Sequence, residues 1–163
     1  MRWSKAGWVF VGVCIVLQLS GLDVFAWEGT VTRVLDGDSL RVKTRGRVET
    51  IRLFGIDCPE HGQAGWAEAK RRATVLMTGK EVSIVPVDVD RYGRTVAVVK
   101  RPGLVVNAEL VRTGMAWVHP FYCKSEPFCQ ELEQLERSAR QLRLGVWRDE
   151  RPVPPWKWKQ RHR

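Results

Sequence analysis

Carboxylates and arginines alternate in three short segments of this chain. The segments are Asp36-Gly37-Asp38, Arg52 through Asp57-Cys58-Pro59-Glu60, and Asp90-Arg91-Tyr92-Gly93-Arg94. Carboxylate oxygens are the ligands that hard cations such as Ca²⁺ prefer. The planar guanidinium group of arginine can donate two parallel hydrogen bonds to a phosphate. If the fold brings these segments together, they can support metal-assisted hydrolysis of a phosphodiester.

The elements that must position these segments are mostly β-strands. Five runs rich in β-branched residues occur in the first two thirds of the chain, separated by Asp-Gly, Arg-Gly and Tyr-Gly turn signals. The predicted strands cover residues 30–35, 39–44, 47–54, 81–87 and 95–100. We therefore expect a mainly β fold with flanking α-helices, built as a small five-stranded barrel plus about three helices.

Three stretches predict the flanking helices. Apolar residues recur at helical spacing in residues 63–77 and 126–144, and a short helix is expected over residues 106–112. In the last stretch the apolar positions are Phe128, Leu132, Leu135, Ala139 and Leu142. Residues 151–163 contain three prolines, so we expect no helix there.

The carboxylates indicate a metal site only when they are considered together. Asp-Gly is a common turn pair, so Asp36 and Asp38 alone predict only a hairpin turn. Asp57 follows an apolar run and comes shortly before Pro59, so a strand is expected to end there with a carboxylate at its tip. Three carboxylates at strand ends predict a Ca²⁺ site.

The same segments resemble the staphylococcal nuclease, or thermonuclease, family. The matching stretches are Val34-Leu35-Asp36-Gly37-Asp38-Ser39, Arg52-Leu53-Phe54-Gly55-Ile56-Asp57-Cys58-Pro59-Glu60 and Asp90-Arg91-Tyr92-Gly93-Arg94, in that order. The resemblance continues through residues 106–114 and 145–147. It implies an OB-fold barrel and a Ca²⁺-dependent phosphodiesterase that cuts DNA and RNA to leave 3′-phosphate ends.

The resemblance also implies a set of metal ligands. Asp38 and Asp57 match the carboxylates that bind Ca²⁺, together with the backbone carbonyl of Cys58. Asp36 matches a third carboxylate close to the metal.

Further roles follow from the same match. Glu60 is expected to orient or deprotonate the attacking water, and Arg52 and Arg94 are expected to clamp the phosphate. Tyr92 and Tyr122 are expected to line the nucleotide pocket. Fixed cations at a phosphodiester stabilise the transition state, which gains negative charge, more than the ground state.

Each of these roles has a structural alternative. Arg52 lies in an apolar strand, where it can serve as a buried arginine paired with Asp57, and Arg94 can be a solvated turn cation. Tyr92 and Tyr122 can be ordinary core or surface aromatics. The alternative function is a non-catalytic OB-fold protein that binds nucleic acid through a basic groove and aromatic stacking.

The charge and the two ends of the chain suggest an exported protein with a polyanionic partner. The 163 residues carry a formal charge of +9, which favours a polyanionic partner. DNA and RNA are the expected partners, but an anionic membrane or a cell-wall polymer would satisfy the same electrostatics. Residues 1–26 resemble a cleaved signal peptide, or a membrane anchor if they are not cleaved. We expect a periplasmic or secreted monomer without an obligate protein partner, with one domain over residues 27–149.

Residues 150–163 form a basic tail rich in proline and tryptophan. Its tryptophans can stack on bases while its cations hold phosphates, or they can fold back onto the barrel while the cations stay solvated.

Three cysteines lie after the predicted signal, namely Cys58, Cys123 and Cys129. In an oxidising compartment the short spacing favours a Cys123–Cys129 disulfide and leaves Cys58 as a free thiol. The other two pairings stay open, because spacing alone does not establish geometry.

Overall fold

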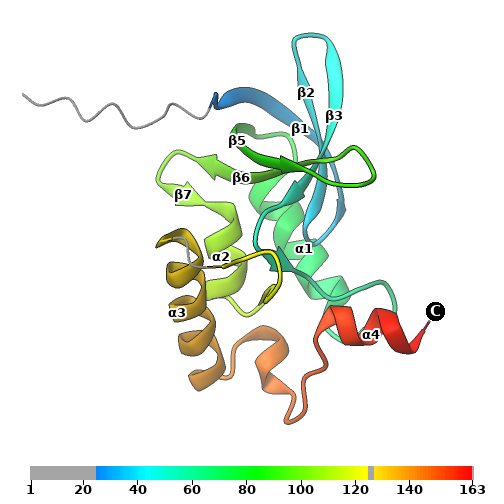
Figure 1. Cartoon of the computed structure of the whole chain (residues 1–163), viewed down its shortest axis with the longest axis vertical. Coiled ribbons are helices and arrows are strands. Elements are labelled where there is room, and N and C mark those ends of the chain that lie inside the picture. The colour runs from blue at the N-terminus through cyan, green and yellow to red at the C-terminus, as the bar shows by residue number, and fades with distance from the viewer. Residues whose placement is uncertain (1–24, 125–126, 163) are drawn as a thin grey trace, which may run out of the picture.

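The strands of the computed structural model, which describes residues 25–124 and 127–162, close into a barrel (Figure 1). Its strands are β1 (Trp27–Asp36), β2 (Ser39–Thr44), β3 (Arg47–Leu53), β5 (Glu81–Val89), β6 (Thr95–Arg101) and β7 (Leu104–Val105). They follow the order β3-β2-β1-β5-β6-β7, and a parallel pairing of β3 with β6 closes the first five. The predicted five-stranded OB-type barrel is confirmed.

The barrel closes around a core of β-branched and leucine side chains. Along β2 the buried Leu40 and Val42 alternate with the exposed Arg41 and Lys43. This alternation is what a strand with one apolar and one solvated face requires. Such side chains from all five strands fill the interior, and the fully buried ones include Val31, Leu40, Val42, Ile51, Ile84 and Val99.

Among residues 25–124 and 127–162, four α-helices flank the barrel, and three of them are the predicted ones. They are α1 (Trp66–Met77), α2 (Val106–Arg112), α3 (Pro127–Gln141) and α4 (Pro155–Arg161). Helix α1 packs against β1, and α2 packs against β6 and α3. A two-stranded ribbon of β4 (Ile56–Asp57) and β8 (Trp117–Val118), and a 3-10 turn at Gly145–Arg148, complete the fold.

The expectation that residues 151–163 contain no helix is wrong, because α4 forms there. Pro155 occupies the first position of α4, after Pro154 as the N-cap residue. A proline is tolerated at this position because its missing N–H has no intrahelical partner to lose. The prolines therefore mark the start of a helix.

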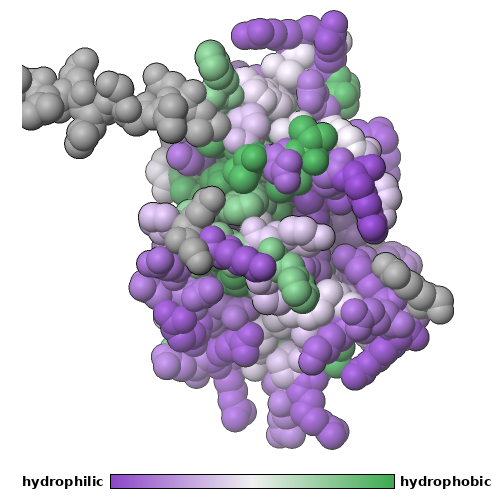
Figure 2. Space-filling view, viewed as in Figure 1, coloured by the Kyte–Doolittle hydropathy of each residue, from purple (hydrophilic) through white to green (hydrophobic). Residues whose placement is uncertain are grey.

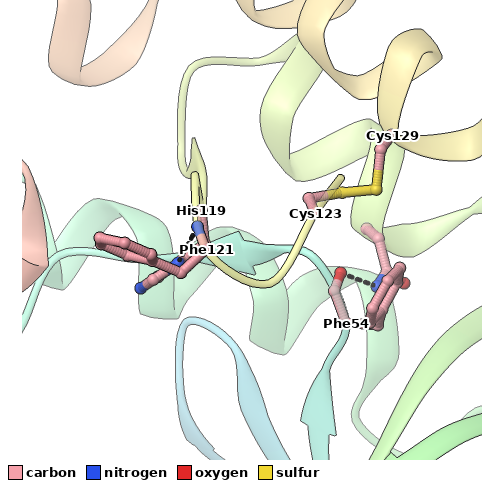
Figure 3. Close-up of a disulfide and its surroundings, with 6 residues drawn as sticks. Phe54, His119, Phe121, Cys123 and Cys129 are labelled. Carbon is pink, nitrogen blue, oxygen red and sulfur yellow. Dashed lines mark hydrogen bonds between the residues drawn. A yellow bond between two sulfur atoms is a disulfide. The ribbon is translucent and has the colours of Figure 1, made fainter. Parts of the chain in front are cut away.

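The predicted disulfide is present. Cys123, in the loop after β8, is bonded to Cys129 near the start of α3, and Figure 3 shows the bridge joining these two elements. Cys58 is a free, buried thiol. Burial, followed by the neighbouring Asp38, raises the pKa of the Cys58 thiol well above its ordinary value, so this thiol stays protonated.

The face of the molecule shown in Figure 2 is mostly hydrophilic. On the face shown in Figure 2, hydrophilic side chains surround a smaller apolar area over the barrel. No helix in residues 25–124 and 127–162 is long and apolar enough to cross a membrane. The predicted signal falls almost entirely on residues 1–24, which lie outside the described residues.

A buried asparagine ties α2 to the barrel. The side-chain amide of Asn107 donates to the carbonyl of Phe54 at 2.9 Å, and its oxygen accepts the N–H of Val99 at 3.0 Å. Asn107 is completely buried, so neither backbone group has water as a substitute partner.

We expect Asn107→Ala to lower the free energy of unfolding by about 2–4 kcal/mol, because it leaves two buried backbone groups unpaired. The measurement is denaturant unfolding. Val75→Ala, at an exposed position of α1, is the control and should change stability by less than about 0.5 kcal/mol. Equal stability of the two variants would contradict the role given to Asn107.

Candidate active site

Two buried aspartates, Asp38 and Asp57, meet at a single arginine. Arg52 Nη2 lies 2.6 Å from Asp57 Oδ1, and Arg52 Nη1 lies 3.2 Å from Asp38 Oδ2. The same Nη1 donates to the carbonyl of Ile56 at 2.8 Å. Arg52 therefore joins the turn after β1 to the end of β4, and its pairing with Asp57 is the one that the structural alternative for Arg52 described.

The register of the barrel explains why these residues meet. Ser39 of β2 pairs with Arg52 of β3, so Asp38 is next to the arginine in the sheet. The Cys58 N–H donates to Asp38 Oδ2 at 2.7 Å and binds the β4 end to the same turn. Gly37 is required here, because a Cβ atom on it would lie 2.6 Å from the Cβ of Cys58.

The negative charge of the carboxylates around Arg52 exceeds the positive charge of its guanidinium group. Burial, followed by repulsion from Asp38, raises the pKa of Asp57 to about 6. Burial alone would lower the pKa of Arg52, but the carboxylates of Asp38 and Asp57 outweigh it, and the pKa rises. Arg52 is therefore permanently charged, and the carboxylates around it carry more negative charge than it can neutralise.

Asp36 has hydrogen-bond partners of its own. Its Oδ1 atom accepts the indole N–H of Trp66 at 2.6 Å and the N–H of Gly37 at 3.0 Å. Burial raises the pKa of Asp36, and the charge of Asp38 acts in the same direction. Within the described part of the chain, no three His, Cys, Asp or Glu side chains are grouped as a ready metal site.

The carboxylate oxygens of this site nevertheless suit a hard cation as ligands. Asp38 and Asp57 are carboxylates, the side chains that Ca²⁺ and Mg²⁺ prefer, and both are buried at the ends of strands. Burial is the larger cause of the raised pKa of Asp57, and a cation there would relieve the repulsion from Asp38 that adds to it.

Glu60 follows Asp57 by three residues and is partly exposed. Lys159 of α4 places its Nζ atom 2.7 Å from Glu60 Oε1 and 3.6 Å from Asp57 Oδ1. Burial opposes the charge of Lys159, but Asp57 and then Glu60 outweigh it and raise the pKa of the ammonium group. Sequence reasoning missed Lys159, because the residues it contacts lie about a hundred positions earlier in the chain.

Arg94 lies at the edge of this group. Its Nε atom pairs with Asp90 Oδ2 at 2.6 Å, and its Nη1 atom lies 3.4 Å from the hydroxyl of Ser39, the neighbour of Asp38. Its guanidinium also lies 5.6 Å from the centre of the Tyr92 ring. The structure thus brings Arg94 and Tyr92 to the same end of the barrel as Asp38.

Tyr122 belongs to an aromatic group around His119. Its exposed ring lies 4.5 Å from the ring of His119, which in turn lies 5.0 Å from Trp156 of α4. Trp156 also packs against the buried Trp117 and Trp147. The tail therefore folds back onto the domain, as one of the two alternatives proposed.

The closed barrel, together with a family match and named relatives, places the chain in the class of OB-fold nucleases, which are hydrolytic enzymes. A family model described as staphylococcal nuclease homologue matches residues 50–149, and the chain belongs to the staphylococcal nuclease family. Nucleases of this family generally depend on a metal ion and act on nucleic acids.

Three relatives are similar to this chain. One from Shigella flexneri, named micrococcal nuclease, is 38% identical over 98% of this chain and 95% of its own length. One from Escherichia coli O157:H7, named uncharacterized endonuclease, is 39% identical over 86% of this chain and 94% of its own. A third with the same name, from Haemophilus influenzae, is 33% identical over 82% and 73%.

The environment of His119 makes the free energy of unfolding depend on pH. Burial, then the charges of Arg52 and Lys159, lower its pKa to about 4. Its Nδ1 atom accepts the N–H of Phe121 at 3.2 Å, so the folded protein favours the neutral ring (Figure 3). The unfolded chain binds a proton near pH 6.5, at about the ordinary histidine pKa, so stability is lost as the pH falls from there towards 4.

We expect His119→Asn to lose less stability than the wild type between pH 7 and pH 4.5, because asparagine keeps an acceptor but does not titrate. The measurement is denaturant unfolding at several pH values. The comparison cancels the opposite contribution of Asp57, whose raised pKa is common to both proteins. Parallel pH profiles for the two proteins would show that His119 does not carry this dependence.

Proposed function

We propose that this protein is an exported, Ca²⁺-dependent nuclease that hydrolyses the phosphodiester bonds of DNA and RNA and leaves 3′-phosphate ends. The observation that carries the proposal is the pair of buried carboxylates, Asp38 and Asp57, held at strand ends by Arg52 and flanked by Glu60. A protein that only binds nucleic acid has no use for this arrangement, because buried carboxylates repel phosphate unless a cation offsets them.

The residues proposed to hold Ca²⁺ are Asp38, Asp57 and the backbone carbonyl of Cys58, with Asp36 close to the metal. When bound, Ca²⁺ would polarise a phosphoryl oxygen as a Lewis acid. The two aspartates support this assignment because they are buried carboxylates with excess negative charge.

Glu60 is proposed to orient the attacking water and accept a proton from it. Its side chain is 30% exposed, so water can reach it, and its carboxylate is held near Asp57 through Lys159. A positioned general base typically raises the reaction rate by a factor of about 10²–10⁴.

Arg52 and Arg94 are proposed to bind the phosphate. Both guanidinium groups lie near Asp38, Arg52 by a direct contact and Arg94 through Ser39. A guanidinium group can donate two parallel hydrogen bonds to phosphate oxygens. These donors stabilise the charge that develops in the transition state. Tyr92, beside Arg94, and Tyr122 are proposed to line the nucleotide pocket.

The hairpin of β2 and β3 supplies an additional basic surface for the substrate. Four exposed cations project from it, and none has an ion-pair partner among residues 25–124 and 127–162; they are Arg41, Lys43, Arg45 and Arg47. Unpaired cations favour a polyanion through counterion release.

Export is proposed from the signal-like residues 1–26 and from the Cys123–Cys129 disulfide, since disulfides persist mainly in oxidising compartments. The signal is proposed to be cleaved, and the mature enzyme to be a monomer without an obligate protein partner. Residues 27–149 are proposed as its nuclease domain.

The test of the metal and of the products is cleavage of end-labelled single-stranded and duplex DNA, and of RNA, in Ca²⁺, Mg²⁺ and chelator. We expect cleavage in Ca²⁺, little or none in chelator, and products that end in 3′-phosphate. Salt-sensitive binding without cleavage in either metal would instead support the non-catalytic OB-fold alternative.

We expect Glu60→Gln to lower kcat by about 100-fold or more, because the amide cannot accept a proton from water. The measurement is steady-state cleavage in Ca²⁺. Glu131→Gln, an exposed position on α3 with the same change in charge, is the control and should retain the wild-type rate. A Glu60→Gln rate within about twofold of the control would remove Glu60 from the mechanism.

A further inference from the structure

Helix α4 is attached to the loop that carries Glu60. The amide of Gln63 donates to the carbonyl of Val153 at 2.6 Å, and the oxygen of the same amide accepts the N–H of Glu60 at 3.0 Å. Gln63 is buried, so this link between the loop and the C-terminal segment is shielded from water. Figure 1 shows α4 (red) beside the segment that leads from β4 into α1.

A second attachment sets the rotation of α4. Pro155 is buried, and Trp156 packs against His119 and the buried pair Trp117 and Trp147. Residues three apart lie on the same side of a helix, so anchoring Trp156 directs Lys159 towards the same side. Its ammonium group reaches both Glu60 and Asp57 there.

Lys159 is what holds the carboxylate of Glu60. Among residues 25–124 and 127–162, it is the only ion-pair or hydrogen-bond partner found for that carboxylate. Glu60 and Asp57 are both acidic and lie within reach of the same ammonium group, at 2.7 Å and 3.6 Å. Without the cation, the two carboxylates repel each other, and the partly exposed Glu60 is free to turn towards solvent.

We propose that Lys159 is a positioning residue of the nuclease, which holds the Glu60 carboxylate beside Asp57 and makes α4 a wall of the active site. This inference rests on the proposed role of Glu60 in activating water. It goes beyond that role because it gives the last helix of the chain, some hundred residues away in sequence, a part in the reaction.

The test compares two lysines of α4 in the full chain. Lys159→Met keeps most of the apolar stem and removes the charge, and Lys157→Met removes the same charge from an exposed position without an ion pair in the described part of the chain. Steady-state cleavage of single-stranded DNA in Ca²⁺ gives kcat and KM, and denaturant unfolding confirms that both variants are folded.

We expect Lys159→Met to lower kcat by about 10-fold or more with little change in KM, because a misplaced Glu60 affects the chemical step and not substrate binding. Lys157→Met should keep the wild-type kcat. Lys159→Arg should restore part of the lost rate, since it returns a cation to the same place.

A metal-free measurement separates positioning from substrate binding. In chelator, an oligonucleotide should bind Lys159→Met and Lys157→Met with equal affinity and equal salt dependence. Weaker binding or a smaller salt slope for Lys159→Met alone would mean that Lys159 contacts a phosphate, and would overturn the positioning role.

The remaining outcomes distinguish this inference from the proposed function. If the wild type cleaves and Glu60→Gln does not, but Lys159→Met matches Lys157→Met in kcat, only the inference about Lys159 fails. A rise in kcat for Lys159→Met would also overturn it. If neither the wild type nor any variant cleaves in Ca²⁺, the proposed function fails and the inference fails with it.

Discussion

The bond of Arg52 to two buried aspartates is the constraint on which the rest of the site depends. Asp38 and Asp57 come from different strand ends, and burying both without a partner would cost several kcal/mol for each charge, by typical desolvation penalties. The guanidinium spans both because the β2–β3 register places it opposite Ser39, next to Asp38. The barrel therefore serves to hold one cation and two anions at fixed positions.

The site is completed by elements that the barrel alone does not contain. The loop after β4 carries Glu60, and Gln63 connects that loop to the C-terminal segment. The tryptophan cluster then fixes α4 against the domain, so that a surface helix presents Lys159 to two carboxylates. Precise placement of a catalytic group usually requires such support from outside the first contacts.

Most of the barrel could be predicted from the sequence, because strand patterning and turn residues are local signals. Strand β2 and helix α2 have the predicted bounds, and the Cys123–Cys129 disulfide follows from a short spacing. The error at α4 arose because a proline counts against a helix in general but not at its first position. The convergence of Asp38 and Asp57 could be expected from turn and strand-end signals, whereas the resemblance to the nuclease family brought Arg52 to the same site.

The sequence by itself thus determined the barrel, three of the four helices in the described residues and the chemical types of the residues at the strand ends. Only the tertiary structure decided that Asp36 accepts a hydrogen bond from Trp66 and that Lys159 reaches Glu60. The physical reason is that patterning reports which face of an element is buried, whereas a contact between distant segments depends on how several elements pack at once. No local signal around Lys159 reports that its neighbours are carboxylates about a hundred residues earlier.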